Sequence, residues 1–136
     1  MRLRIALFGL VLCVCLAQVM VAQDAAKVDA SHYTVISDNA RVRILKAHYG
    51  PHEKSVMHSH PDAVAVFLTD GNVRFTFPDG KTQDSVVTAG TARYTPHTVH
   101  MPENLSDKDM EVIVIELKGG MAKPMATKMS DDNMKK

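Results

Sequence analysis

The chain has 136 residues, of which 46% are hydrophobic and 23% are charged, and its formal net charge is +1. This length allows a single domain. The near-neutral charge and the 5% aromatic content exclude a basic, aromatic-rich surface, so nucleic acid is not an expected partner.

Residues 1–23 have the layout of a secretory signal peptide. Arg2 and Arg4 give a positive start, a mainly apolar run follows up to residue 22, and the chain then becomes polar. An uncleaved membrane anchor is the alternative, because the apolar run is close to membrane-spanning length. We expect an exported protein, periplasmic or secreted, with no stable membrane association after cleavage.

Both cysteines, Cys13 and Cys15, lie in this leader. A lipid-modified form would need a small residue before the cysteine, and Leu12 and Val14 stand there instead. The mature chain would contain no cysteine, which excludes thiol nucleophiles, disulfides and cysteine-ligated zinc. Cleavage would also leave 14 basic against 15 acidic residues, a net charge near −1.

After a polar linker over 24–31, a domain of short strands is expected over 32–118. Residues 41–45 and 72–77 alternate hydrophobic and polar side chains, which is typical of half-buried strands. The apolar, β-branched run 112–115 is typical of a strand covered on both faces. The expected strands are 33–36, 41–48, 55–60, 63–69, 72–77, 83–88, 92–95, 98–102 and 110–117.

Turn signals separate these strands. Residues 70–72 read Asp-Gly-Asn and residues 78–81 read Pro-Asp-Gly-Lys, both of which favour tight turns. No stretch between residues 30 and 118 has the pattern of an amphipathic helix of ten or more residues. The pattern therefore predicts an all-β sandwich or small barrel. A small open barrel has edge strands, and we expect the region 33–45 to be an edge that a homodimer could cover.

From residue 119 the composition changes to Lys, Asp, Ser and Met. Met121, Met125 and Met129 recur at intervals of four. One interpretation is a thioether site for Cu(I). The other, which we favour because lysines and aspartates accompany the methionines, is a flexible, solvated tail over 119–136.

A pair of histidines marks the candidate site. His58 and His60 are two residues apart in a strand-like context, so their side chains point to one face of a sheet. A third histidine, His100, lies in a later strand-like segment. Imidazole is the commonest metal ligand, whereas we interpret the isolated His32 and His48, as well as His52, as surface or structural residues.

Two blocks of the sequence resemble the two motifs of the cupin family. The blocks contain, in order, Gly50, His58, His60 and Gly71, and then Gly90, Pro96, His97, His100 and Asn104. The resemblance covers residues 41–117 and implies an antiparallel double-sheet (jelly-roll) barrel. It also implies a mononuclear site in which His58, His60 and His100 bind a divalent transition metal such as Fe, Zn, Ni, Cu or Mn.

The sequence departs from the family pattern in three places. The gap between Gly50 and His58 is long, the glycine usual after Pro96 is absent, and Val64 stands where the family usually has a glutamate ligand. We expect Val64 to face the metal from the same side as His60, so that Val64→Glu would tighten metal binding. Three neutral imidazoles leave the full charge on the metal, which favours a small anionic ligand.

Other polar residues could support the metal site. Asp62 has the strand parity of His60 and is a candidate fourth ligand or outer-shell partner. Tyr94 and His97 are further candidates for the outer shell, with His97 at the mouth of the barrel because its parity differs from that of His100. The alternative is a barrel without a metal, whose histidines bond to one another or to a ligand.

Two classes of function follow, and cupins include both. The first is a metal-dependent enzyme that activates water or dioxygen towards a small anionic molecule; thiol dioxygenases with three histidines are cupins of this kind. The second is a non-catalytic ligand-binding or accessory module. The fold alone does not choose between them.

Overall fold

The computed structural model describes residues 23–119, so the expected signal peptide and tail lie outside the described residues except for Gln23 and Gly119. Strands form at all the expected places, with ends that differ by a few residues, and the segment 55–60 narrows to its last three residues. The elements are α1 (Ala25–Val28), β1 (Tyr33–Asp38), β2 (Val42–Tyr49), β3 (His58–His60), β4 (Ala63–Phe67), β5 (Gly71–Thr76), β6 (Thr82–Val87), β7 (Ala92–Thr95), β8 (Thr98–Asn104) and β9 (Met110–Leu117).

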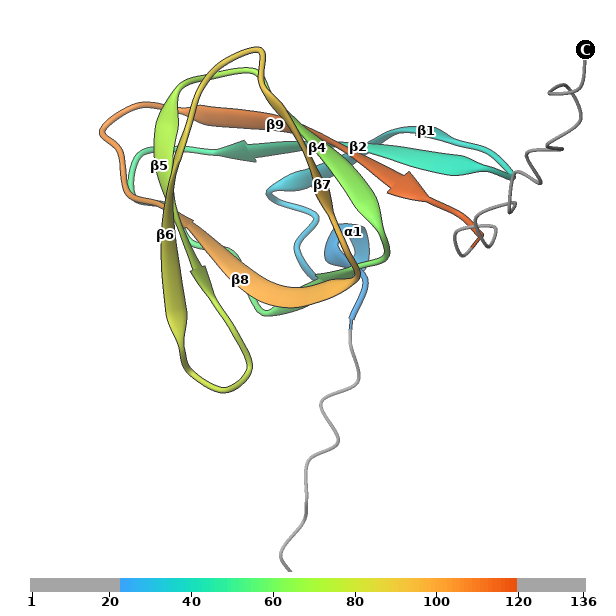
Figure 1. Ribbon diagram of the computed structural model, residues 1–136, viewed down its shortest axis with the longest axis horizontal. Helices are drawn as coiled ribbons and strands as arrows, with labels where there is room; N and C mark the ends of the chain where they lie inside the picture. Colours follow the sequence, from blue (N-terminus) through green and yellow to red (C-terminus); the bar gives the residue numbers. More distant parts are fainter. Residues whose placement is uncertain (1–22, 120–136) are drawn as a thin grey trace, which may run out of the picture.

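The strands form two antiparallel sheets that face each other (Figure 1). One sheet has five strands in the order β1-β2-β9-β4-β7, and the other has four in the order β3-β8-β5-β6. This arrangement confirms the expected all-β jelly-roll fold. Within residues 23–119 no strand ladder joins the two sheets, so the expected barrel is two facing sheets rather than a ring closed by hydrogen bonds.

Strand β9 lies between β2 and β4 and contributes much of the core. Its inward residues Met110, Val112 and Val114 are buried, and so is Glu116. The alternate residues, Ile113 and Ile115 among them, are only half-buried, so the strand is less covered on its outer face than its composition suggests. The core consists of the buried residues Ala25, Tyr33, Leu45, Ala47, Tyr49, Ala63, Phe67, Val73, Val87, Met110, Val112 and Val114.

The segment 24–31, expected as a linker, is packed against the sheets. Ala25 is fully buried and Asp29 is 5% exposed. Asp24 forms an ion pair with Arg43 at 2.7 Å, and the Gln23 carbonyl accepts the backbone N–H of Ser59 at 2.7 Å. The carboxylates of Asp24 and Asp29 thus have partners within the fold, Arg43 and Ser55 among them, whereas composition alone suggests solvent exposure.

Strand β1 is an edge of the five-stranded sheet, as expected. After Tyr33 all its residues are exposed, including Val35 and Ile36. The expected turn at 78–81 also forms, because the Phe77 amide donates to the Lys81 carbonyl and Gly80 has a φ of 80°, which glycine adopts without strain. None of the helices over residues 23–119 is both long and apolar enough to cross a membrane.

Candidate metal centre

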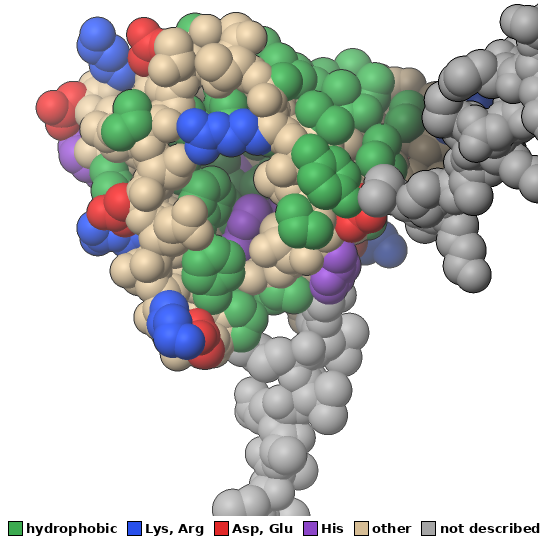
Figure 2. Space-filling view, in the orientation of Figure 1, with side chains coloured by type: hydrophobic (Ala, Val, Ile, Leu, Met, Phe, Trp, Pro, Cys, Tyr) green, Lys and Arg blue, Asp and Glu red, His purple; other side chains and the backbone are tan. Residues whose placement is uncertain are grey.

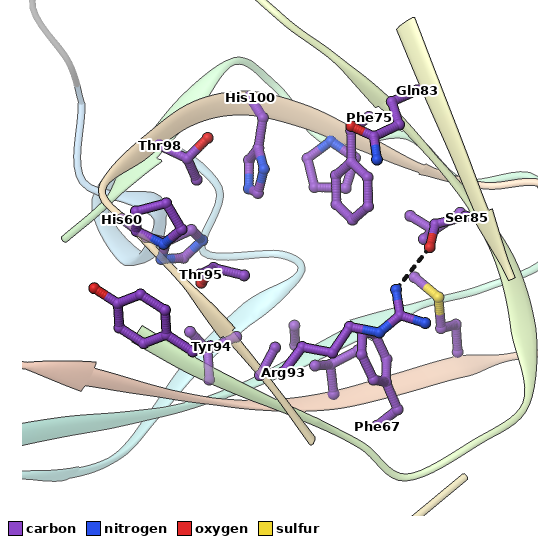
Figure 3. A pocket seen from close by; sticks show the side chains of 18 of the residues that line it. His60, Phe67, Phe75, Gln83, Ser85, Arg93, Tyr94, Thr95, Thr98 and His100 are labelled. Carbon is purple, nitrogen blue, oxygen red and sulfur yellow. Dashed lines mark hydrogen bonds between the residues drawn. The ribbon is translucent and has the colours of Figure 1, made fainter. Parts of the chain in front are cut away.

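Strands β3 and β8 bring three histidines together. His58 pairs directly with His100 across the two strands, and His60 shares the face of His58. One ring nitrogen from each of His58, His60 and His100 lies within 4.8 Å of the others. The predicted histidine cluster is therefore confirmed. Figure 3 shows His60 and His100 directed into the cavity between the sheets.

The outer nitrogens of two of these rings have acceptors. The Nδ1 of His58 lies 2.8 Å from the Val56 carbonyl, and the Nδ1 of His60 lies 2.8 Å from Oε1 of Glu116. A carbonyl and a carboxylate only accept, so these contacts assign the proton of each ring to Nδ1. Each Nε2 then carries the ring's lone pair, an arrangement typical of metal-binding histidines.

The third ring supplies an unsatisfied atom. The Nε2 of His100 is buried and has no hydrogen-bond partner in the described part of the chain. Buried polar atoms normally have a partner, and a buried imidazole nitrogen beside two others fits a metal ion. The donor set thus agrees with a three-histidine metal site.

The electrostatics keep the rings of His58 and His100 neutral. Burial, with the neighbouring His60, lowers the pKa of His58 to about 4. Burial, with His58 and His60, lowers the pKa of His100 to about 3. Both imidazoles are therefore unprotonated near pH 7, as metal binding requires.

Glu116 is a buried anion with two cationic or hydrogen-donating neighbours. Its Oε2 lies 2.5 Å from Nε of Arg43, and its Oε1 accepts from His60. Burial alone would raise the pKa of Glu116, but the bonds to His60 and Arg43 outweigh it and the net pKa is lowered. Glu116 therefore stays ionised and orients His60.

A pair of buried phenols lies against His58. The Tyr49 hydroxyl donates to the Tyr33 hydroxyl at 2.8 Å, and the Tyr33 hydroxyl lies 3.1 Å from Nε2 of His58. Burial raises the pKa of both phenols, so they remain protonated. Because Nδ1 of His58 carries its proton, the Tyr33 hydroxyl donates to Nε2, the same atom that would bind a metal.

A second buried carboxylate supports the other side of His58. Ser55 donates to Asp29, and its Oγ lies 3.1 Å from Nδ1 of His58. Asp29 also accepts from His32 at 2.7 Å. Burial raises the pKa of Asp29, but the bonds from Ser55, His32 and Ser31 outweigh it and the net pKa is lowered.

These supporting residues were not predicted from the sequence. One of them, Glu116, has a signal in the sequence, because it is a carboxylate in register with the inward apolar positions of its strand. Asp29 and Ser55 have no comparable signal, since the bond that joins them spans 26 residues of the chain and neither lies in a strand. For Tyr33 and Tyr49 the sequence predicts only strand or edge positions and gives no sign of a contact with the histidines.

The prediction that Val64 faces the metal is wrong. On β4 the alternate residues Ala63, Ala65 and Phe67 share the inner face. Ala63 and Phe67 belong to the core, and Ala65 and Phe67 line the cavity. Val64 pairs with Ile115, on the outer face of β9. The turn at 61–62 breaks the strand between β3 and β4, so residue parity does not continue from His60.

Of the other candidate residues, Tyr94 and His97 line the cavity, whereas Asp62 is not among its described lining residues. Asp62 accepts the backbone N–H of His97 at 2.8 Å, and none of its hydrogen bonds within residues 23–119 reaches the three histidines. Tyr94 and His97 line the cavity and are exposed, which agrees with the position predicted for His97. Of the other histidines, His48 and His52 are exposed, while His32 stacks on Tyr49, as expected for surface or structural residues.

The cavity between the sheets has a volume of about 460 Å³. Figure 2 shows histidine atoms within a hollow whose rim is largely hydrophobic. Phe75 stacks on His100 with ring centroids 5.2 Å apart, and Phe67 and Phe77 also line the space. The expectation that these phenylalanines are core or cavity-lining residues is confirmed.

The fold and the site together define a jelly-roll protein with a histidine cluster inside its two sheets. A model of the cupin domain matches residues 45–116. Because the match covers more than half of the chain, the protein belongs to the cupin family. No curated protein matches the chain.

Several solved structures share the fold. A cupin domain from Bordetella pertussis Tohama I is 31% identical, with a TM-score of 0.60 over 64% of this chain and 92% of that chain. A protein with a double-stranded beta-helix domain from Klebsiella pneumoniae is 16% identical, with a TM-score of 0.53 over 66% and 78%. A cupin superfamily protein from Desulfitobacterium hafniense is 17% identical, with a TM-score of 0.50 over 64% and 76%.

Proposed function

We propose that this protein binds one divalent transition metal through His58, His60 and His100 and uses it to bind or transform a small anionic molecule. The observation that carries the proposal is the cluster of three ring nitrogens within 4.8 Å of one another, with Nε2 of His100 buried and unpartnered. Imidazole ligands suit Fe, Zn, Ni and Cu, and Mn also remains a candidate.

Charge supports an anionic ligand. The three imidazoles are neutral ligands, and Glu116 is already paired with Arg43. Among the described residues that line the cavity there is no aspartate or glutamate. A dication in this site would therefore keep most of its charge, which an anion or hydroxide would offset.

The protein's own residues have definable tasks at such a site. Glu116 holds His60 in the tautomer that presents Nε2, and the Val56 carbonyl does the same for His58. Tyr33 is a protonated donor beside the same ring, able to donate to a ligand once Nε2 of His58 is occupied. Phe75 and the neighbouring apolar side chains limit water around His100. When bound, the metal would supply Lewis acidity and lower the pKa of a coordinated water.

The first test is the metal content of the untagged protein by mass spectrometry, compared with a His58→Ala/His60→Ala variant. We expect about one metal per chain in the native protein and none in the variant. A matched control is His48→Ala/His52→Ala, which removes two exposed histidines and should leave the metal content unchanged. No metal in the native protein, with the fold intact by circular dichroism, would overturn the proposal.

A non-catalytic ligand-binding or accessory module is the second candidate. It is favoured by the same lack of a carboxylate general base among the described cavity-lining residues. The two candidates differ in turnover. A ligand recovered chemically unchanged after long incubation with the metal-loaded protein and air would support the binding module, and a converted ligand would support the enzyme.

Export is a further part of the proposal, and it is supported by the sequence of residues 1–23. We expect the mature protein to be found in the periplasm or the medium, with its N-terminus close to Gln23. N-terminal sequencing of the protein from fractionated cells checks this. A full-length chain in the membrane fraction would support the anchor instead.

A further inference from the structure

Arg93, on β7, places a cation in the cavity. Its Nη1 donates to Ser85 Oγ at 2.8 Å and its Nη2 donates to the Val86 carbonyl at 3.0 Å. Its Cζ lies 5.6 Å from the centroid of the Phe67 ring. In Figure 3 the guanidinium lies towards Ser85 and Phe67, away from His60. The side chain is therefore held in the cavity wall at a place separate from the histidine cluster.

The charge of Arg93 is not neutralised within the described chain. Arg43 and Arg74 each pair with carboxylates at 2.7 Å or less. Arg93, in contrast, forms no ion pair with any aspartate or glutamate of residues 23–119, and its two acceptors are neutral. A guanidinium has five N–H donors, so three of them have no acceptor in this part of the protein.

The surroundings of Arg93 set the character of a partner. Phe67 lies beside the guanidinium, and Phe75 and Val73 add apolar lining to the same cavity. A carboxylate matches the planar guanidinium and its parallel N–H donors. A phosphate dianion carries two negative charges, and the exposed Arg93 is the one Lys or Arg among the described lining residues, so it would neutralise only one of them. A singly charged, partly apolar ligand therefore fits best.

We propose that Arg93 binds the carboxylate of a small monocarboxylate whose apolar body lies against Phe67 and Phe75. The cavity volume of about 460 Å³ is within the usual range for small-molecule sites. The position of Arg93 and the histidines on the same cavity means that such a ligand can extend towards the metal centre. The approach of the ligand to the metal centre rests on the proposed function, whereas carboxylate binding by Arg93 does not.

The test uses two probes, 3-phenylpropanoate and hexanoate, with their uncharged amides as matched ligands, in titration calorimetry on the purified protein. We expect at least one acid to bind saturably, with its amide bound about 10- to 100-fold more weakly. Arg93→Met should weaken binding of the acid by a similar factor and leave the amide unchanged. Arg93→Lys, which keeps the positive charge but lacks the parallel N–H donors of the guanidinium, should give an intermediate loss of affinity for the acid.

Arg41→Met is the matched control, because Arg41 is an exposed arginine that does not line the cavity, and it should bind the acid like the native protein. Equal affinity for acid and amide, no binding of either acid, or an unchanged affinity in folded Arg93→Met would overturn the inference. The His58→Ala/His60→Ala variant distinguishes a failure of this inference about Arg93 from a failure of the proposed function. Acid binding that persists there while the metal is lost supports Arg93, and acid binding in a native protein without metal overturns only the metal proposal.

Discussion

The two ends of the cavity are built differently. Around the histidines, polar atoms are buried and nearly all have partners: Glu116, Tyr33 and Ser55 each contact a ring at 3.1 Å or less. At the mouth, Arg93, Tyr94 and His97 are exposed. Buried polar networks fix geometry, whereas exposed side chains adapt to what binds. The centre is thus prepared for one chemistry, while the mouth can select ligands without altering that centre.

The largest effect is expected from breaking the support of the centre at Glu116. Glu116→Gln removes the charge that holds both His60 and Arg43. Loss of an outer-shell carboxylate weakens metal affinity by about 10- to 100-fold. Arg43 would keep only its ion pair with Asp24, and the loss of its bond to Glu116 should lower the free energy of unfolding by about 1 to 3 kcal/mol. Metal titration and chemical denaturation measure the two effects.

Glu111→Gln is the matched control, because Glu111 lies on the outer face of the same strand and pairs with Lys46 at a half-exposed site. Its effect on metal affinity should be negligible and its effect on stability below about 1 kcal/mol. If Glu116→Gln and Glu111→Gln behaved alike, the carboxylate would have no special relation to the site.

The second prediction concerns pH and the metal-free protein. The folded-state pKa values of His58 and His100, about 4 and about 3, lie below the unfolded value of about 6.5. Below pH 6.5 the unfolded chain therefore takes up protons that the folded chain rejects. The stability contribution is fully present above pH 6.5 and is lost as the pH falls towards 4 and then 3.

Denaturation of the chelator-treated protein between pH 7 and pH 5 measures this effect, because most carboxylates stay ionised in that window. The slope should correspond to an uptake of up to about two protons on unfolding. The exposed-histidine variant His48→Ala/His52→Ala should keep the slope. A stability that does not change over this window would contradict the neutral, buried state of the two rings.

The sequence predicted the strands and the histidine cluster because both depend on local spacing. Alternation over 41–45 fixes a strand and its faces, and His58 and His60 share a face whatever the rest of the chain does. The supporting contacts of Glu116 and Tyr33 depend on long-range pairing: Glu116 is 56 residues from His60 in the chain, and Tyr33 is 25 residues from His58. The prediction for Val64 was wrong for a related reason. The turn at 61–62 interrupts the strand, so the alternation of inner and outer faces does not continue from His60 to Val64.

The third prediction tests whether Tyr33 supports His58 or binds the metal itself. Tyr33→Phe removes the hydroxyl between Tyr49 and His58, leaving the buried Tyr49 hydroxyl without its acceptor. The cost should be about 1 to 3 kcal/mol of unfolding free energy in the metal-free protein. Metal affinity should not fall, because the phenol competes for Nε2 of His58 instead of binding the metal. A large loss of affinity would make Tyr33 a ligand.

The smallest effect is expected outside the cavity, at Val64. Its pairing with Ile115 directs it to the outer face of the sheet, so Val64→Glu should leave metal affinity and the preferred metal unchanged. Ala65 is the comparison, since it lines the cavity from the next position. Ala65→Glu brings a carboxylate to the inner face and should alter metal affinity or selectivity if the fold survives, which circular dichroism monitors. If Val64→Glu tightened metal binding and Ala65→Glu did not, Val64 would lie on the inner face of β4 and Ala65 on the outer face, the reverse of the structure.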